Sequence, residues 1–181
     1  MDRLPLTSIR WPFAALGASL AMLAAAHGFE RFMHLAPCVL CYNQRQVYWA
    51  AAALSVVAIF LIRRGPTSRL LFTFNLLIGV AFLVSMCVAG YHSLVEWGIL
   101  PAPDTCAAGL GAPISDDLAS QREGPIAVPS CAEPLSELFG LTMANYNTAI
   151  SLGLAIATFY AAYHPVGADT ANELPSEAAA E

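Results

Sequence analysis

Residues 70–91 read LLFTFNLLIGVAFLVSMCVAGY, an apolar run of membrane-spanning length. An α-helix rises about 1.5 Å per residue, so roughly 20 apolar residues are needed to cross the hydrocarbon core of a bilayer. The run is interrupted only by mildly polar residues such as Thr73, Asn75 and Ser85. It therefore predicts a transmembrane helix, and it sets the fold class that we expect for the rest of the chain.

Three further apolar stretches surround this one, at about residues 13–29, 46–62 and 145–163. Hydrophobic residues make up 57% of the chain and charged residues only 12%, whereas roughly a quarter of the residues are charged in soluble domains. No internal repeat is visible. We therefore expect one all-α domain over residues 1–181, an integral membrane four-helix bundle with one long irregular loop.

The arginines predict the orientation of the bundle, because the chain contains no lysine. Five of the eight positively charged residues lie before the first span or between the second and third: Arg3, Arg10, Arg63, Arg64 and Arg69. Cytoplasmic segments of membrane proteins carry an excess of positive charge. This bias predicts cytoplasmic termini and places the links at about residues 30–45 and 92–143 on the outer, periplasmic side.

The first span admits a second interpretation, a cleaved signal peptide. Arg3 and Arg10 precede an apolar run that contains three alanines at 24–26, as signal peptides often do. The alanines are not followed by a polar stretch, which favours a retained helix. The other end of the chain, residues 165–181, is acidic and Ala-rich, and we expect a disordered cytoplasmic tail. The net charge of −5 owes much to this tail and indicates no partner such as nucleic acid.

A Cys-x-x-Cys pair at residues 38–41 (CVLC) stands at the start of the second apolar stretch, directly after Pro37. If Pro37 occupies the first turn of the helix, the two cysteines share one face, and Arg45 follows one turn later. The partial positive charge at a helix N-terminus favours the thiolate form of a cysteine. The pattern predicts redox chemistry with a lipid-soluble partner at the membrane edge.

The long outer segment contributes two more cysteines, Cys106 and Cys131. A zinc site would require two closely spaced pairs, but these two are 25 positions apart. Haem attachment would require a histidine after Cys41, and Tyr42 stands there. We expect no metal site. Two structural disulfides stay open, although a Cys-x-x-Cys loop closes too little chain to add much stability. Cys87, inside the third span, is expected to be a small packing residue.

Leu135, Leu138 and Phe139 fall at positions i, i+3 and i+4 after Pro134. This spacing favours a short helix whose apolar face lies on the membrane surface. A hairpin that forms a small core of the loop is the alternative.

Residues 37–45 (PCVLCYNQR) resemble the signature of the DsbB family, the quinone-dependent membrane oxidases of disulfide bond formation. The similarity covers nearly the whole chain except the acidic tail, including residues 91–92 (YH), 131–133 (CAE) and 139–141 (FGL). It implies a multi-pass oxidoreductase of the bacterial inner membrane. Such a protein reoxidises a periplasmic thioredoxin-fold dithiol protein, which is DsbA-like, and passes the electrons to a membrane quinone, either ubiquinone or menaquinone.

The resemblance also implies a role for each cysteine of the two pairs. Cys106 and Cys131 would oxidise the soluble partner, with Cys106 forming the mixed disulfide. Cys38 and Cys41 would pass electrons to the quinone, with Cys41 nearest the ring. Cys131 would exchange with Cys38 between the two pairs.

Arg45 and His92 match residues at the quinone site of the family. Arg45 would stabilise a thiolate or a reduced quinone oxygen, and an interfacial arginine is the alternative. His92 and Glu96 form an i, i+4 pair that would relay protons to the quinone. For Glu96 an exposed interfacial position is favoured, and Glu30 is expected to be a boundary anchor.

Two other functions stay open from the sequence. One is a specialised family member that serves a dedicated partner. The other is a membrane scaffold with four helices whose disulfides only brace its loops.

Overall fold

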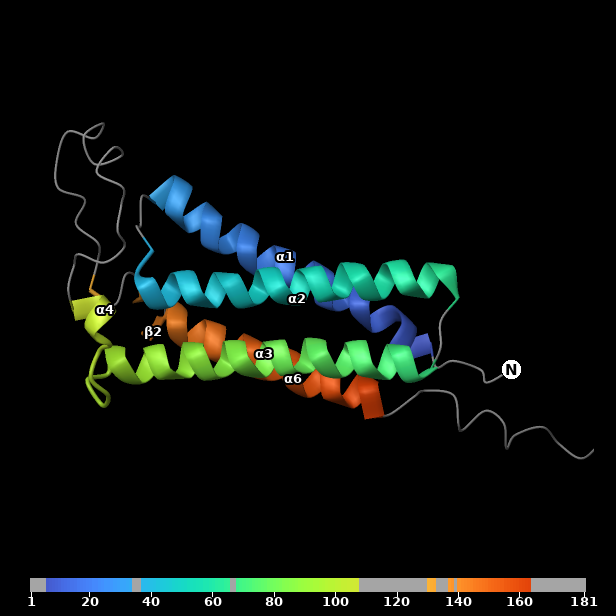
Figure 1. Cartoon of the computed structure of the whole chain (residues 1–181). Helices are drawn as coiled ribbons and strands as arrows, with labels where there is room; N and C mark the ends of the chain where they lie inside the picture. Colours follow the sequence, from blue (N-terminus) through green and yellow to red (C-terminus); the bar gives the residue numbers. More distant parts are fainter. Residues whose placement is uncertain are drawn as a thin grey trace, which may run out of the picture.

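The structure, a computed structural model, describes residues 6–33, 37–65, 68–107, 130–132, 137–138 and 140–163. Its four long helices are α1 (Leu6–Met33), α2 (Val39–Arg64), α3 (Ser68–Glu96) and α6 (Met143–Tyr163). They form a single bundle (Figure 1), in which α3 packs against both α2 and α6, and α1 packs against α2. The predicted all-α membrane bundle is confirmed.

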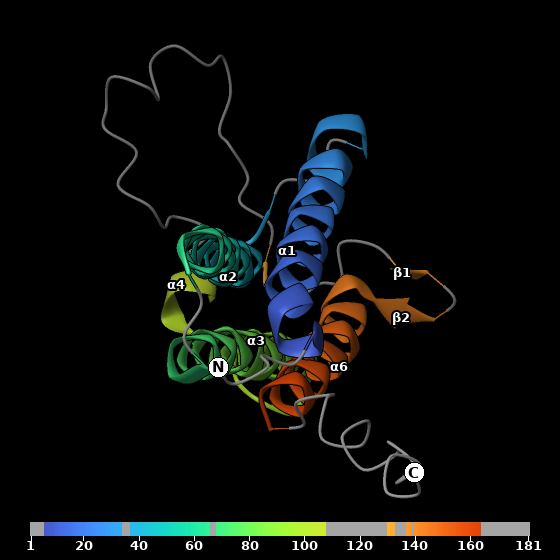
Figure 2. The ribbon, with the colours of Figure 1, turned by 90° about the vertical axis from the view of Figure 1, so that its right-hand side faces the viewer.

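Three small elements complete the described fold, namely α4 (Asp104–Ala107), β1 (Glu137–Leu138) and β2 (Leu141–Thr142). Helix α4 and strand β2 both lie at the end of the bundle where α2 begins (Figure 1). Seen nearly end-on, the hairpin and α4 stand on different sides of the bundle (Figure 2). This end therefore carries the connecting segments that hold Cys106 and Cys131.

Three of the helices are long and apolar enough to cross a membrane, over Ile9–Met33, Val39–Arg64 and Arg69–Glu96. Helix α6 is 21 residues long and starts with a more polar turn. Large apolar side chains such as Phe60 and Ile156 are more than half exposed on the outer face of the bundle. A surface of this kind is suited to lipid, where backbone groups are satisfied within each helix.

The helices extend beyond the predicted apolar spans. The link predicted at residues 30–45 is mostly helical, because α1 continues to Met33 and α2 begins at Val39. Similarly, α3 continues to Glu96, so the segment predicted as a loop from residue 92 starts inside a helix. Hydropathy marks the part of a helix that faces hydrocarbon, whereas these polar end turns are stabilised by contacts between helices. Residues 108–129 and the acidic tail, 165–181, lie outside the described residues.

The spacing after Pro134 favoured a short helix, and this prediction is wrong at the positions that the structure describes. Glu137 and Leu138 pair with Thr142 and Leu141 as antiparallel strands. Gly140 has φ +76° in the connecting turn, a left-handed conformation that glycine adopts without steric cost. The strand pairing of the hairpin alternative is therefore observed.

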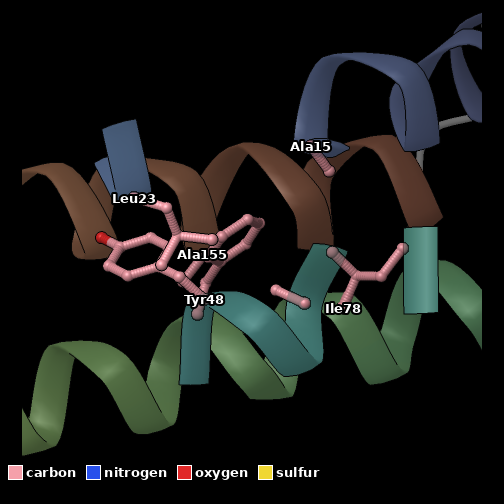
Figure 3. Close-up of a cluster of buried hydrophobic side chains, with 7 residues drawn as sticks. Ala15, Leu23, Tyr48, Ile78 and Ala155 are labelled. Carbon is pink, nitrogen blue, oxygen red and sulfur yellow. The ribbon is translucent and has the colours of Figure 1, made fainter. Parts of the chain in front are cut away.

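The centre of the bundle is packed by a cluster of aromatic, aliphatic and small side chains from all four long helices. Its members are Ala15, Leu23, Tyr48, Ala51, Ile78, Phe82 and Ala155, five of which are labelled in Figure 3. Small residues let membrane helices approach closely. The tightest example is Gly79 of α3, where an added Cβ would lie 2.8 Å from Cε1 of Phe159 on α6.

Candidate functional site

Cys38 caps the N-terminus of α2. Its backbone is extended, and its Sγ accepts a hydrogen bond from the backbone N–H of Cys41 at 3.3 Å. Pro37 therefore precedes the N-cap, and the position in the first helical turn considered for it is wrong. The Sγ atoms of Cys38 and Cys41 lie 2.7 Å apart as free thiols, with Cys38 buried and Cys41 partly exposed. Because a disulfide has an S–S distance of about 2.05 Å, small rotations suffice to join them.

The pKa of the Cys38 thiol is held well below its usual range. A hydrogen bond with the Cys41 thiol is the main cause, and the imidazole of His92 adds to it, while burial opposes both. The Cys38 thiolate is the nucleophilic form of this cysteine. The helix start therefore holds one sulfur in a reactive state.

His92, near the end of α3, faces this sulfur. Its Nε2 lies 3.7 Å from Sγ of Cys38 and 3.6 Å from Oε1 of Glu96. The side chains of His92 and Glu96 are only 4% and 5% exposed, so the exposed position favoured for Glu96 is wrong. The reason is the hairpin, from which Thr142 donates a hydrogen bond to Oε2 of Glu96.

Cys106 and Cys131 form a disulfide with an S–S distance of 2.02 Å, as the family resemblance implies. Both residues are buried in one cluster with Cys38. The two cysteine pairs, 65 positions apart at their closest in the sequence, thus meet at one end of the bundle.

The connection from α3 to Cys106 is held at two points. Gly98, with φ +69°, turns the chain where α3 ends. The hydroxyl of Tyr91 donates a hydrogen bond to the carbonyl of Pro101 at 2.9 Å. This connection leads directly into α4, which carries Cys106.

Arg45 lies one turn after Cys41, as predicted, but its guanidinium points to α1. It donates hydrogen bonds to Oε2 of Glu30 and to the carbonyl of Ala26. The Arg45 side chain is 13% exposed, so the ion pair with Glu30 is well shielded on the arginine side. Glu30 is therefore the ion-pair partner of Arg45. The sequence analysis expected only a boundary anchor at Glu30 and did not identify this contact.

A buried chain of polar side chains was missed by the sequence analysis. Nε2 of Gln44 lies 3.1 Å from Nδ1 of His92, and Asn147 donates from Nδ2 to Oε1 of Gln44 at 2.6 Å. The Tyr48 hydroxyl donates to Oδ1 of Asn147, also at 2.6 Å. A usable signal was present, because polar residues within membrane helices usually face the bundle interior.

Cys87 lies on the opposite face of α3, and it is exposed. The prediction that it packs inside the bundle is wrong. The helical period explains this, because Phe82, Ser85 and Ala89 occupy the buried face.

Two adjacent cysteine pairs at the end of a membrane helix bundle define a membrane protein suited to thiol-disulfide exchange. The comparison with known families agrees, since the family described as "Disulfide bond formation protein DsbB" matches residues 8–161. The chain belongs to the DsbB family. Membership and the apolar helices together make it a multi-pass protein of the inner membrane with a role in disulfide bond formation.

The chain is also similar to the uncharacterized protein RP370 of Rickettsia prowazekii (strain Madrid E). The two are 26% identical over 150 residues, which cover 81% of this chain and 83% of that protein. No solved structure matches the chain.

Proposed function

We propose that this protein reoxidises a periplasmic thioredoxin-fold dithiol protein of the DsbA type and passes the electrons to a membrane quinone. The observation that carries the proposal is the buried cluster that contains Cys38, Cys106 and Cys131. Exchange between the two pairs requires their sulfurs to come into contact. Because the three cysteines already lie in one buried cluster, exchange between the two pairs requires no large rearrangement.

The proposed electron path consists of disulfide exchanges followed by one two-electron oxidation. The partner's two thiols reduce the Cys106–Cys131 disulfide and become a disulfide themselves. The Cys131 thiolate then attacks Cys38 of the oxidised Cys38–Cys41 pair and releases Cys41 as a thiolate. Cys106 attacks the Cys131–Cys38 bond, which restores the loop disulfide and releases Cys38. The Cys38–Cys41 dithiol finally gives two electrons and two protons to the quinone and closes again.

The groups near Cys41 fit a quinone substrate. Cys41 is partly exposed at the start of a membrane helix, beside the exposed aromatic ring of Tyr42. A guanidinium has five N–H donors, so the bonds that Arg45 makes to α1 leave capacity for a quinone oxygen. Arg45 would then bind a reduced quinone while Glu30 holds it in place.

The positions of the arginines support the proposed orientation of the bundle in the membrane. The cysteine cluster lies at the end where α2 begins, whereas Arg63, Arg64 and Arg69 lie at the opposite end, between α2 and α3. Positive charge favours the cytoplasmic side, so the cysteines would face the periplasm.

The decisive experiment combines the purified protein, a reduced DsbA-like protein and a soluble quinone analogue in detergent. We expect one quinone to be reduced for each partner disulfide formed, in the wild type and in the Cys87→Ala control. A folded protein that oxidises no partner in the presence of quinone would support the scaffold alternative. Oxidation of one partner from the same organism, but not of a general DsbA, would support a specialised member of the family.

A further inference from the structure

We propose that Gln44, Asn147 and Tyr48 are positioning residues that hold His92 in one tautomer, protonated at Nε2, so that it donates a hydrogen bond to the sulfur of Cys38. The inference deepens the proposed function and rests on the role given there to Cys38. Its basis is the direction of each hydrogen bond in the buried chain that links α6, α2 and α3.

The direction of the hydrogen bonds follows from the orientation of the Asn147 and Gln44 amides, read from the Tyr48 end of the network. The Tyr48 hydroxyl donates to Oδ1 of Asn147, which leaves the Asn147 amide nitrogen facing Gln44. That nitrogen donates to Oε1 of Gln44, and the Gln44 amide nitrogen consequently faces Nδ1 of His92. An amide nitrogen can only donate. In this arrangement Nδ1 accepts, and the proton of the neutral imidazole lies on Nε2.

The surroundings of Nε2 are complementary to that proton. Nε2 lies 3.7 Å from Sγ of Cys38 and 3.6 Å from Oε1 of Glu96, and both groups accept hydrogen bonds when ionised. The charged or titratable groups near the His92 ring are Cys38, Cys41 and Glu96. Helix α6 contributes only the uncharged Asn147 to the hydrogen-bond network.

Burial of the hydrogen-bonded side chains favours this one orientation of the two amides. Gln44 and Asn147 are each 7% exposed, and Tyr48 is 3% exposed. A buried amide that rotated away from its partners would leave both a donor and an acceptor unsatisfied, which is costly inside a membrane bundle. The three residues therefore act on Cys38 only through His92, and none of them is placed at the reacting sulfurs.

Two substitutions at Gln44 separate a positioning role from a merely structural one. Gln44→Leu removes the donor to Nδ1, so the tautomer is no longer fixed. Gln44→Glu keeps the bond to Asn147 but offers an acceptor to Nδ1, which then gains a proton while Nε2 keeps its own. The exposed Gln46, two residues further along α2, provides matched controls in Gln46→Leu and Gln46→Glu.

The first measurement is ¹⁵N NMR of histidine-labelled, reduced protein, with the His92 signals assigned through His92→Gln. We expect Nε2 alone to be protonated in the wild type, both nitrogens in Gln44→Glu, and a mixture of tautomers in Gln44→Leu. The second measurement is the rate of Cys38 alkylation as a function of pH. Peptide fragmentation identifies Cys38 as the modified cysteine. Gln44→Leu should slow the alkylation by roughly tenfold near neutral pH, as expected for loss of one hydrogen bond to a charged group. Gln44→Glu should not slow it.

Protonation at Nδ1 alone in the wild type would overturn the proposal. Equal slowing by Gln44→Leu and Gln44→Glu would also overturn it, because that result indicates a structural role only. Asn147→Leu gives an independent check, since it should reproduce the mixed tautomers without changing either Gln44 or His92. Neither measurement uses a partner or a quinone, so failure of this inference is distinguishable from failure of the proposed electron path.

Discussion

At the scale of single residues, the ionisation of Cys38 is the feature most open to measurement. Its pKa is lowered in the folded protein by Cys41 and then His92, so the folded state favours the thiolate. This contribution to stability is complete above about pH 8.5, the ordinary value for a thiol, and is lost as the pH falls through the lowered value. We expect Cys38 of the reduced protein to react with iodoacetamide well below pH 8, whereas the same cysteine in denaturant should not. His92→Gln should move the reaction toward higher pH. An unchanged profile in that variant would remove His92 from this role.

Arg45 gives a second prediction at this scale. Arg45→Gln should raise the KM for the quinone by about tenfold, since a hydrogen bond to a charged group contributes about 1.5–3 kcal/mol. Arg45→Lys should recover only part of the loss, because lysine keeps the charge but not the planar set of donors. Single-turnover oxidation of the partner should be nearly unchanged in both variants. Arg31→Gln, at an exposed arginine of α1, is the matched control for quinone kinetics. Normal quinone kinetics in a correctly inserted Arg45→Gln protein would reduce Arg45 to an interfacial anchor.

The candidate site was only partly predictable from single residues. The spacing of Cys38, Cys41 and Arg45 indicated a redox helix start, and the resemblance implied the pairing of the loop cysteines. The partners of Arg45 and His92 could not be found in this way. Glu30 and Gln44 come from sequence positions with no fixed spacing to them, and only packing of the helices brings their side chains into contact.

At the scale of the elements, the contact between α3 and α6 depends on Gly79. Exchanging glycine for alanine in a helix normally stabilises it by up to about 1 kcal/mol. At Gly79 the added Cβ would meet the ring of Phe159 at 2.8 Å, so we expect Gly79→Ala to destabilise the bundle by about 1–3 kcal/mol instead. Gly153→Ala on α6 has no neighbour within 4 Å of the added Cβ and should be neutral or stabilising. Unfolding in mixed detergent measures the free energy of unfolding of both alanine variants. The double variant Gly79→Ala/Phe159→Leu should recover part of the loss, and equal stability of the two alanine variants would contradict the packing argument.

The elements themselves were more predictable than their ends. Apolar length predicts the four long helices, because burial in hydrocarbon requires a closed set of backbone hydrogen bonds. The final turn of α3 is stabilised because side chains from β2 and α2 form hydrogen bonds with Glu96 and His92. Hydropathy carries no information about those contacts. The hairpin at Gly140 was hidden for a related reason, since two short strands and one helical turn place apolar residues at similar spacings.

At the scale of the whole molecule, the two cysteine pairs should fail differently when each is interrupted. Cys38→Ser should still trap a mixed disulfide with the partner through Cys106, but should not sustain turnover with quinone. Cys106→Ser should lose the partner adduct altogether, because the attacked loop disulfide can no longer form. Non-reducing gels of mixtures with the reduced partner measure the adduct, and quinone absorbance measures turnover. Undiminished steady-state turnover in either variant would exclude a relay through both pairs.

The bond between Tyr91 and Pro101 limits how far the chain can carry Cys106 away from the membrane helices. Cys106 lies five positions after Pro101, and an extended chain spans at most about 3.6 Å per residue. While the bond holds, Cys106 can travel no further than about 18 Å from that anchor, even if α4 uncoils completely. A soluble protein that exchanges disulfides here must therefore descend to the lipid surface, with its own reactive sulfur on an outermost, unobstructed part of its fold.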